Sequence, residues 1–187
     1  MNIIQRAKDI LLSPKQTWPA IETEATDVTS LYTQYLMILA LIPAIAGFIG
    51  MSLIGVNAFG FSVRVPLVTG LVNMLVGYVL SLAMVYVLAL IADALAPTFG
   101  GQKNPMNALK MVAYSSTAGM VGGVFSIVPA LSALGLIASL YSIYLLFIGL
   151  PILMKSPREK ALGYTAVLLV CGLIAGAVIG GVSALLR

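Results

Sequence analysis

Few side chains in the apolar part of this chain could take part in chemistry. Asp93 and Lys110 flank a short loop that is rich in proline and glycine, and Tyr114 follows Lys110 at helical spacing. Buried acidic and basic groups in membrane proteins often line substrate or proton pathways. The pattern therefore predicts a polar mouth in which Asp93 and Lys110 could form an ion pair. The other candidate members are Tyr114, Tyr141, Tyr144 and the deeper Asn73.

A second interpretation of the same residues stays open, and we favour it. Asp93 and Lys110 lie near segment ends rather than at a membrane midplane, so they could be an interfacial charge pair beside tyrosines that pack between helices. The chain has no histidine, which is the commonest metal ligand and the side chain that titrates near neutral pH. It has no glycine-rich phosphate loop either, and its single cysteine, Cys171, lies within an apolar run. These features predict no enzyme, no metal site and no cofactor.

The composition indicates an integral membrane protein. Hydrophobic residues make up 60% of the chain and charged residues only 9%, whereas a soluble domain carries about 25% charged residues. The formal charge of +4 arises from basic residues scattered at segment ends. That distribution is typical of a membrane topology signal and does not favour a nucleic-acid partner.

The order of apolar segments predicts an all-α, polytopic membrane protein. Residues 1–30 form a cytoplasmic amphipathic N-terminal segment, and residues 31–187 form a bundle of five transmembrane helices. A helix needs about 20 apolar residues to cross the hydrocarbon core. The five expected spans are about 31–56, 66–92, 107–128, 130–154 and 162–186.

The N-terminal segment shows helical periodicity. Its apolar residues Ile3, Ile4, Ala7, Ile10 and Leu11 recur on one face, and Ser13-Pro14 marks the break before a second helical turn. Tryptophan prefers the headgroup region, so Trp18 is predicted to be an interfacial anchor. The segment could dock a partner or lie on the membrane, and we favour the membrane-lying anchor.

Two stripes of small residues repeat every fourth position and predict close helix packing. Packing within the monomer is favoured over packing between protomers. The first stripe is in the third expected span and the second is in the fifth. Their members are Ser115, Gly119, Gly123, Gly172, Gly176 and Gly180.

The basic residues predict the orientation. With a cytoplasmic N-terminus, eight basic residues fall inside and two outside, which obeys the positive-inside rule. Five spans then place the C-terminus on the periplasmic side. The inside residues are Arg6, Lys8, Lys15, Lys103, Lys110, Lys155, Arg158 and Lys160, and the outside residues are Arg64 and Arg187.

Several stretches spread over nearly the whole chain carry a family resemblance. They are 10–18 (ILLSPKQTW) followed by Ile21 and Glu24, 100–101 (GG), 107–115 (NALKMVAYS), Pro129, and 140–151 (LYSIYLLFIGLP). Together they resemble the Yip family of Ypt/Rab-interacting five-span membrane proteins, and in particular its bacterial branch. The resemblance implies a multi-pass protein of the bacterial inner membrane with no catalytic motif.

The eukaryotic members of that family are implicated in vesicle traffic through a long cytosolic N-terminal region. Here the segment spans only residues 1–30 and lacks an Asp-Leu-Tyr-Gly-Pro motif, which disfavours a small-GTPase partner. Two functional hypotheses remain. The chain could organise membrane lipids or partner membrane proteins, with a homo-oligomer possible, or it could be a small transporter or channel with a pathway between spans 2, 3 and 4.

Overall fold

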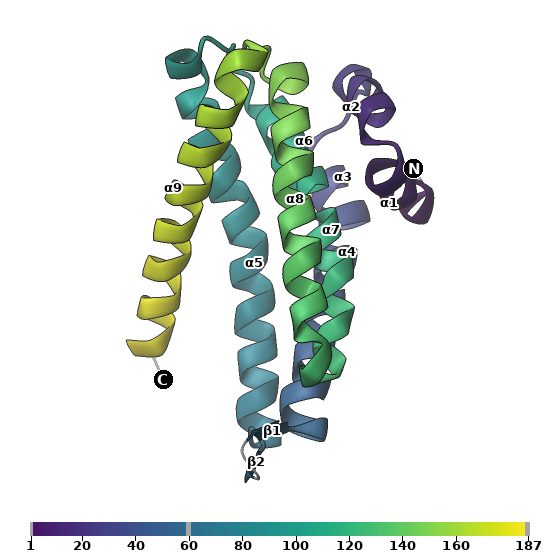
Figure 1. Ribbon diagram of the computed structural model, residues 1–187, viewed down its shortest axis with the longest axis vertical. Helices are drawn as coiled ribbons and strands as arrows, with labels where there is room; N and C mark the ends of the chain where they lie inside the picture. The colour runs from purple at the N-terminus through teal and green to yellow at the C-terminus, as the bar shows by residue number, and fades with distance from the viewer. Residues whose placement is uncertain (1, 59–60, 186–187) are drawn as a thin grey trace.

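The chain is almost entirely helical (Figure 1). The computed structural model describes residues 2–58 and 61–185, with side-chain surroundings except at 56–62, 179–180 and 182–185. The elements in chain order are α1 (Ile3–Leu12), α2 (Pro14–Thr23), α3 (Val28–Leu31), η1 (Tyr32–Leu36), α4 (Met37–Phe48), η2 (Ile49–Ile54), β1 (Val56–Ala58), β2 (Phe61–Val63), α5 (Leu67–Leu95), η3 (Ala96–Phe99), α6 (Pro105–Ser115), α7 (Thr117–Gly122), η4 (Gly123–Ile127), η5 (Pro129–Leu131), α8 (Ser132–Leu153) and α9 (Arg158–Leu185).

Four helical stretches of the described chain are long and apolar enough to cross a membrane. They are Val28–Ile54, Leu67–Phe99, Pro129–Leu153 and Arg158–Val178. The prediction of an all-α membrane protein is confirmed to that extent, whereas the count of five spans is not confirmed. One addition is a pair of three-residue antiparallel strands, β1 and β2, in the connection before α5.

The predicted third span, residues 107–128, does not form one continuous helix. In place of a single helix, the chain forms α6, then the short α7, then the 3₁₀-helical η4. The Ser116 hydroxyl donates to the Val112 carbonyl at 2.7 Å at the first break, and such bonds compete with the helical backbone ladder. Gly122, Gly123 and Pro129 then favour further interruption. This interrupted passage still runs alongside α8 towards the end of the bundle that carries the strands (Figure 1).

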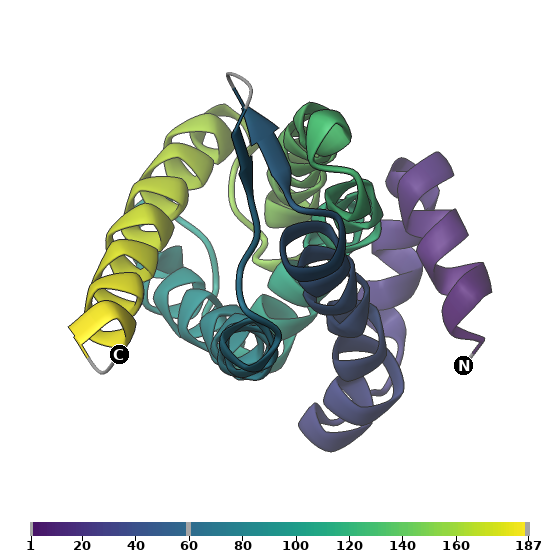
Figure 2. The same cartoon turned by 90° about the horizontal axis from the view of Figure 1, so that it is seen from below.

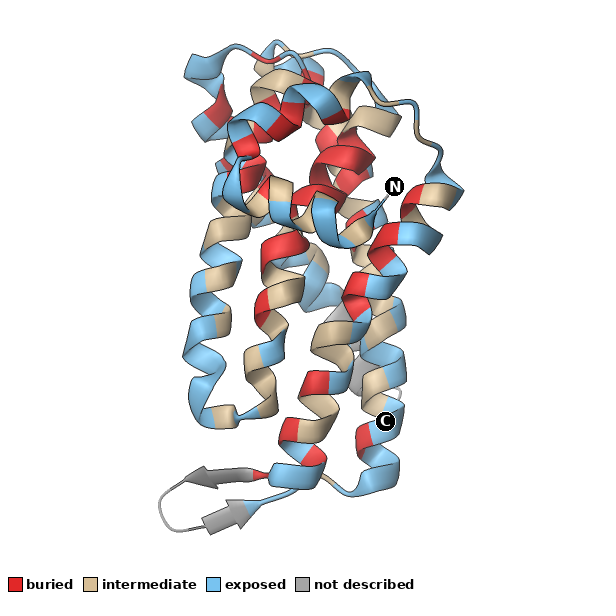
Figure 3. Cartoon of the chain, turned by 90° about the vertical axis from the view of Figure 1, so that its right-hand side faces the viewer, coloured by how far each residue is buried: buried red, intermediate tan, exposed pale blue. Residues whose placement is uncertain are grey.

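The buried core lies in one half of the bundle. Figure 3 shows buried residues gathered at the end that carries α1, α2 and α6, together with the adjoining ends of α5, α8 and α9, which we call the packed end. The opposite half exposes large apolar side chains from every long helix, which suits a surface covered by lipid. Seen from below, the α1–α2 hairpin and α9 lie on opposite sides of the bundle (Figure 2).

The first predicted stripe of small residues lies at close helix contacts. Ser115 is buried, with only 4% of its surface exposed. A Cβ built on Gly119 would lie 3.4 Å from the Ser142 hydroxyl, and one on Gly123 would lie 2.5 Å from Pro43 Cβ. In the passage from α6 to η4, the glycine that lies closest to a neighbouring side chain is Gly122, which is outside the stripe.

The second predicted stripe is close to a neighbour at only one end. A Cβ on Gly172 would lie 3.0 Å from a Leu88 methyl group, whereas one on Gly176 would meet only the end of Met84, at 3.7 Å. The surroundings of Gly180 lie outside the described residues. Leu168, one turn before Gly172, is 2% exposed. The tight part of the α5–α9 contact therefore ends near Gly172.

We predict that Gly122→Ala lowers the free energy of unfolding by about 1–3 kcal/mol, because the added methyl group overpacks the α7–α8 contact. Its Cβ would lie 2.2 Å from Ala138 Cβ. Unfolding in detergent provides the measurement. Ala138→Gly in the same chain should recover part of the loss. The matched control is Gly77→Ala on α5, where nothing lies within 4 Å; equal losses at both positions would contradict the contact.

Candidate functional site

The two N-terminal helices fold into a closed hairpin. The Asn2 side chain caps α1 by accepting from the Ile4 and Gln5 amides. At the turn, the Thr17 hydroxyl lies 2.9 Å from the Asp9 carbonyl and 2.8 Å from the Ser13 carbonyl, so it links the end of α1 to the start of α2. Polar contacts within residues 2–17 therefore fix the start of α1 and the turn between the two helices.

The hairpin is fastened to the bundle by Trp18. Its side chain is fully buried, and a Cβ built on Gly149 of α8 would lie 3.0 Å from the indole ring. Only glycine leaves room for the ring at this position. Trp18 was predicted to be an anchor in the lipid headgroups, but its contacts here are with protein.

The apolar face of α1 also packs inward. Ile10 is fully buried, and Ile3 and Leu11 lie against the core. The Tyr141 hydroxyl of α8 donates to the Leu11 carbonyl at 2.7 Å and holds the end of α1 to the bundle. This arrangement differs from the predicted helix lying on the membrane, because tertiary packing uses the same apolar face that lipid would have covered.

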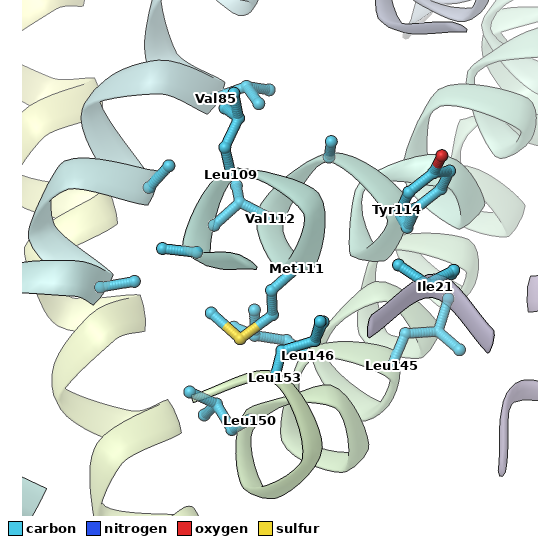
Figure 4. Close-up of a cluster of buried hydrophobic side chains, with 14 of the residues drawn as sticks. Ile21, Val85, Leu109, Met111, Val112, Tyr114, Leu145, Leu146, Leu150 and Leu153 are labelled. Carbon is cyan, nitrogen blue, oxygen red and sulfur yellow. The ribbon is translucent and has the colours of Figure 1, made fainter. Parts of the chain in front are cut away.

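Lys110 binds the hairpin rather than Asp93. Its ammonium group donates to the Ile21 carbonyl at 3.0 Å and to the Glu24 carbonyl, at the end of α2. Terminal helix carbonyls lack intrahelical partners and favour a cation. Figure 4 shows Ile21 beside Tyr114, at the edge of the buried cluster. The predicted ion pair with Asp93 does not form, because the hairpin occupies the space that Lys110 faces.

Tyr114, one turn after Lys110 on α6, forms the centre of a polar and aromatic cluster. Its ring lies 4.7 Å from that of Tyr35, and the Arg6 guanidinium lies 5.8 Å from its centroid. Arg6 also forms an ion pair with Glu24, which joins the two helices of the hairpin. The Tyr35 hydroxyl hydrogen-bonds the Thr117 hydroxyl at 2.7 Å.

We call this region the N-terminal junction, and define it by the residues that join the hairpin to α6 and α8. They are Arg6, Trp18, Glu24, Lys110, Tyr114, Tyr141 and Gly149. Beside it is a polar cavity of about 480 Å³. Its lining is Glu24, Ala25, Thr26, Asp27, Ser30, Leu31, Gln34 and Tyr114.

Asp27 gives the cavity a fixed acidic group. Its carboxylate accepts from the Ser30 hydroxyl at 2.5 Å and from the Ser30 amide at 3.1 Å, at the start of α3. The Ser30 hydroxyl, followed by the Ser30 amide, holds the pKa of Asp27 below its ordinary value, since both contacts favour the charged form. This side chain is therefore a carboxylate at neutral pH and caps the helix that leads into the first long apolar stretch.

Of the predicted polar mouth, the structure brings only part together. Lys110, Tyr114 and Tyr141 meet at the junction, and the Tyr144 ring lies 5.5 Å from that of Tyr141 with 43% of its surface exposed. Asn73 lies elsewhere and lines a groove between α4 and α5.

Asp93 is also separate from the junction. It stands next to Ala92, whose carbonyl accepts a hydrogen bond from the Tyr164 hydroxyl of α9. Its Oδ1 atom is buried without a hydrogen-bond partner in the described part of the chain. The ion pairs among the described residues are Arg6–Glu24 and Lys155–Glu22, and neither includes Asp93.

The loop between η3 and α6 closes the packed end over the last turn of α8. The Gln102 amide donates to the Met154 carbonyl at 2.8 Å, and the Asn107 side chain donates to the Leu153 carbonyl at 3.2 Å. Gly100 has a φ of 72°, and a Cβ on Gly101 would lie 2.6 Å from the Met154 carbonyl oxygen. The paired glycines are therefore needed for this close approach.

Sequence reasoning missed Arg6 and Glu24 as members of the N-terminal junction, and it missed the contact between Tyr35 and Thr117 next to Tyr114. The one available signal was the Ser13-Pro14 break, which folds α2 back on α1 and so brings Arg6 towards Glu24. The pairing of Tyr35 with Thr117 joins residues 82 positions apart and has no local signature. Among the described residues, no group of three or more His, Cys, Asp or Glu is placed to hold a metal ion.

A family model and two curated relatives match most of this chain. The family model described as the Yip1 domain matches residues 8–179. The inner membrane protein YohC of Escherichia coli strain K12 is 25% identical over 165 residues, which covers 86% of this chain and 85% of that protein. The protein of the same name from Escherichia coli O6:H1 matches equally. No solved structure matches. The matched region begins within α1 and includes α2, α6 and the four long apolar stretches. The chain belongs to the Yip1 family.

Proposed function

We propose that this Yip1-family membrane protein has a non-enzymatic role in the bacterial inner membrane, where it organises lipids or partner membrane proteins through its cytoplasmic face. The observation that carries the proposal is the N-terminal junction. It fastens an amphipathic hairpin to the packed end by a buried tryptophan, a buried lysine and an ion pair. The hairpin still exposes Ile4, Leu12 and Lys8 outward, and 80% of the Leu12 surface is exposed.

The packed end is proposed to face the cytoplasm. It carries Arg6, Lys8 and Lys15 on the hairpin, Lys103 and Lys155 on loops, and Arg158 and Lys160 in the first turn of α9. Arg64 is at the opposite end, beside the short strands. The positive-inside rule favours a cytoplasmic packed end. Because α9 runs away from that end (Figure 1), its C-terminal end is then proposed to lie on the periplasmic side.

A transporter would need a water-filled route from the junction towards Asn73. The polar cavity at Tyr114 and the groove at Asn73 share no lining residue. Between them lies a buried layer that includes Tyr35, Leu36, Leu39 and the fully buried Thr117. This closed layer supports the organising role over transport.

Thiol labelling tests both the closed layer and the orientation. In a Cys171→Ala background, which removes the chain's one cysteine, we expect Ala25→Cys to react with a membrane-impermeant maleimide, because Ala25 is exposed beside the polar cavity. Thr117→Cys should not react, because its side chain has no exposed surface. Labelling is measured on inverted vesicles and on intact spheroplasts.

Each arm has an outcome that contradicts the proposal. Reaction of Ala25→Cys in intact spheroplasts would place the packed end outside. Reaction of Thr117→Cys with the reagent would show water inside the closed layer and favour transport. As a control, both variants are labelled again after denaturation in detergent, when both thiols should react fully.

A further inference from the structure

Helix α1 lies across the bundle rather than along it. Figure 2, which looks along the long helices from the end that carries the strands, shows α1 lengthwise at the edge of the molecule, with no other segment in front of it. In Figures 1 and 3, α1 lies beside α2 and nearer than α2 to the half of the bundle that exposes apolar side chains. In a chain whose long helices span a membrane, α1 therefore runs parallel to the membrane surface.

The depth of α1 can be measured along the first long apolar stretch. The Arg6 guanidinium of α1 lies over the Tyr114 ring, which in turn contacts the Tyr35 ring. From Tyr35 to Ile54 the chain is helical through η1, α4 and η2. At about 1.5 Å per residue this passage is about 25–30 Å long, which is close to the thickness of the hydrocarbon core. The level of Tyr35 is therefore one hydrocarbon thickness from the far end of the stretch.

The exposed side chains of the same stretch change type at this level. Thr33 and Gln34 are exposed just before Tyr35, and Met37 and Ile38 are exposed just after it. Polar side chains suit the headgroup region, and apolar ones suit the hydrocarbon. Both measures therefore place α1 where the hydrocarbon begins.

One face of α1 turns away from the protein at this boundary. Ile4 is 65% exposed and Leu12 is 80% exposed. Lys8, also exposed, stands between them at four-residue spacing, so the three side chains form one stripe on the helix surface. The opposite face, with the fully buried Ile10, packs on the bundle. The outward stripe is therefore separate from the face that fastens the hairpin.

The unpaired charge on the hairpin is positive. The acidic side chains of residues 2–24 are all engaged by a hydrogen bond or an ion pair within the protein: Asp9 with Gln5, Glu22 with Lys155, and Glu24 with Arg6. Lys8 in the stripe and Lys15 at the start of α2 are exposed, and neither forms an ion pair with a described residue. The outward surface therefore combines apolar side chains with positive charge and suits an anionic, partly apolar partner.

We propose that this stripe binds the cytoplasmic leaflet, with Ile4 and Leu12 among the upper acyl carbons and Lys8 and Lys15 at the phosphates of anionic glycerophospholipids. Helices that lie in the interface bury their apolar side chains about 5–10 Å into the boundary between headgroups and acyl chains, and anionic headgroups attract the lysines beside them. An acidic soluble protein would fit the two lysines, but it would have to displace the headgroups that surround α1 at this level. The inference rests on the organising role proposed above and names anionic lipid as the partner of the hairpin.

Fluorescence quenching in reconstituted vesicles tests the contact. In the Cys171→Ala background, Leu12→Cys carries an environment-sensitive NBD label. The vesicles contain equal amounts of phosphatidylcholine and phosphatidylglycerol, and the acyl chains of one or the other carry a nitroxide quencher. Both quenchers should lower the emission, and nitroxide on phosphatidylglycerol should do so about twofold or more strongly because the lysines attract that lipid. The matched control is Ala20→Cys, an exposed position on α2, which should show little quenching by either lipid.

A charge variant separates the lysines from the apolar side chains. Lys8→Gln with Lys15→Gln, both at exposed positions, should remove the excess quenching by phosphatidylglycerol and keep the quenching by phosphatidylcholine. Equal quenching at positions 12 and 20, or none at position 12, would overturn the lipid contact. Equal quenching by the two lipids with both lysines present would overturn the preference for anionic lipid. Both leaflets of these vesicles have the same composition, so the result does not depend on the orientation, which the Ala25→Cys labelling tests separately.

Discussion

Trp18→Ala is expected to lower the free energy of unfolding by about 3–5 kcal/mol, because truncating a fully buried large aromatic leaves a cavity that the surroundings fill only in part. Trp18 has no exposed surface and packs against Gly149 at the interface between α2 and α8. The α1–α2 hairpin should therefore loosen from the bundle before the long helices separate.

Circular dichroism during unfolding in detergent measures the first effect, since the substitution removes the chain's one tryptophan. Limited proteolysis measures the second, with cleavage expected in the connection at residues 24–27. Trp18→Phe is the matched control. Because the indole N–H is buried without a partner, phenylalanine keeps much of the packing and removes an unsatisfied donor. If Trp18→Ala melts and resists protease as wild type does, the hairpin is not held by this side chain.

Lys110→Met should cost about 1.5–3 kcal/mol, the range for a hydrogen bond to a charged group. The ammonium group binds the Ile21 and Glu24 carbonyls, and methionine of similar length would leave the buried Ile21 carbonyl without that partner. Unfolding in detergent measures the loss. Lys103→Met, at an exposed position in the loop before α6, is the control and should fall within about 0.5 kcal/mol of wild type.

A double-mutant cycle separates this arrangement from the ion pair that the sequence suggested. Asp93 and Lys110 share no hydrogen bond or ion pair in the structure, so the losses from Asp93→Asn and Lys110→Met should add within about 0.3–0.5 kcal/mol. Recovery in the double variant would show that the two side chains interact, and would contradict the position of the hairpin described here.

The residue pattern alone was sufficient to predict the class of protein and its family. Low charge and long apolar runs predicted a helical membrane protein, because hydrocarbon admits few other structures. The stretches around Trp18, Gly100-Gly101, Asn107–Ser115 and Leu140–Pro151 indicated the Yip family, which the Yip1 domain match confirms. These features are local, or repeat along the chain, so they can be identified without knowing which helices are neighbours.

The third expected span shows where hydropathy misleads. Residues 107–128 are apolar enough on average, yet they form α6, α7 and η4 instead of one helix. Average hydropathy does not register the combined effect of Ser116, Gly122 and Gly123 on backbone geometry, nor the support that an irregular passage receives from α8 beside it. Neighbouring helices can satisfy such a passage, and only the fold provides them.

The partners of individual side chains were decided by tertiary structure. A lysine near a helix end can bind a carboxylate or the free carbonyls of another helix, and the position of the hairpin selects the carbonyls for Lys110. An amphipathic segment can lie on lipid or on protein, and Gly149 selects protein by leaving space for Trp18. Each choice depends on groups more than 80 positions apart in the chain, so sequence spacing indicates which groups can interact, while packing determines which of them do.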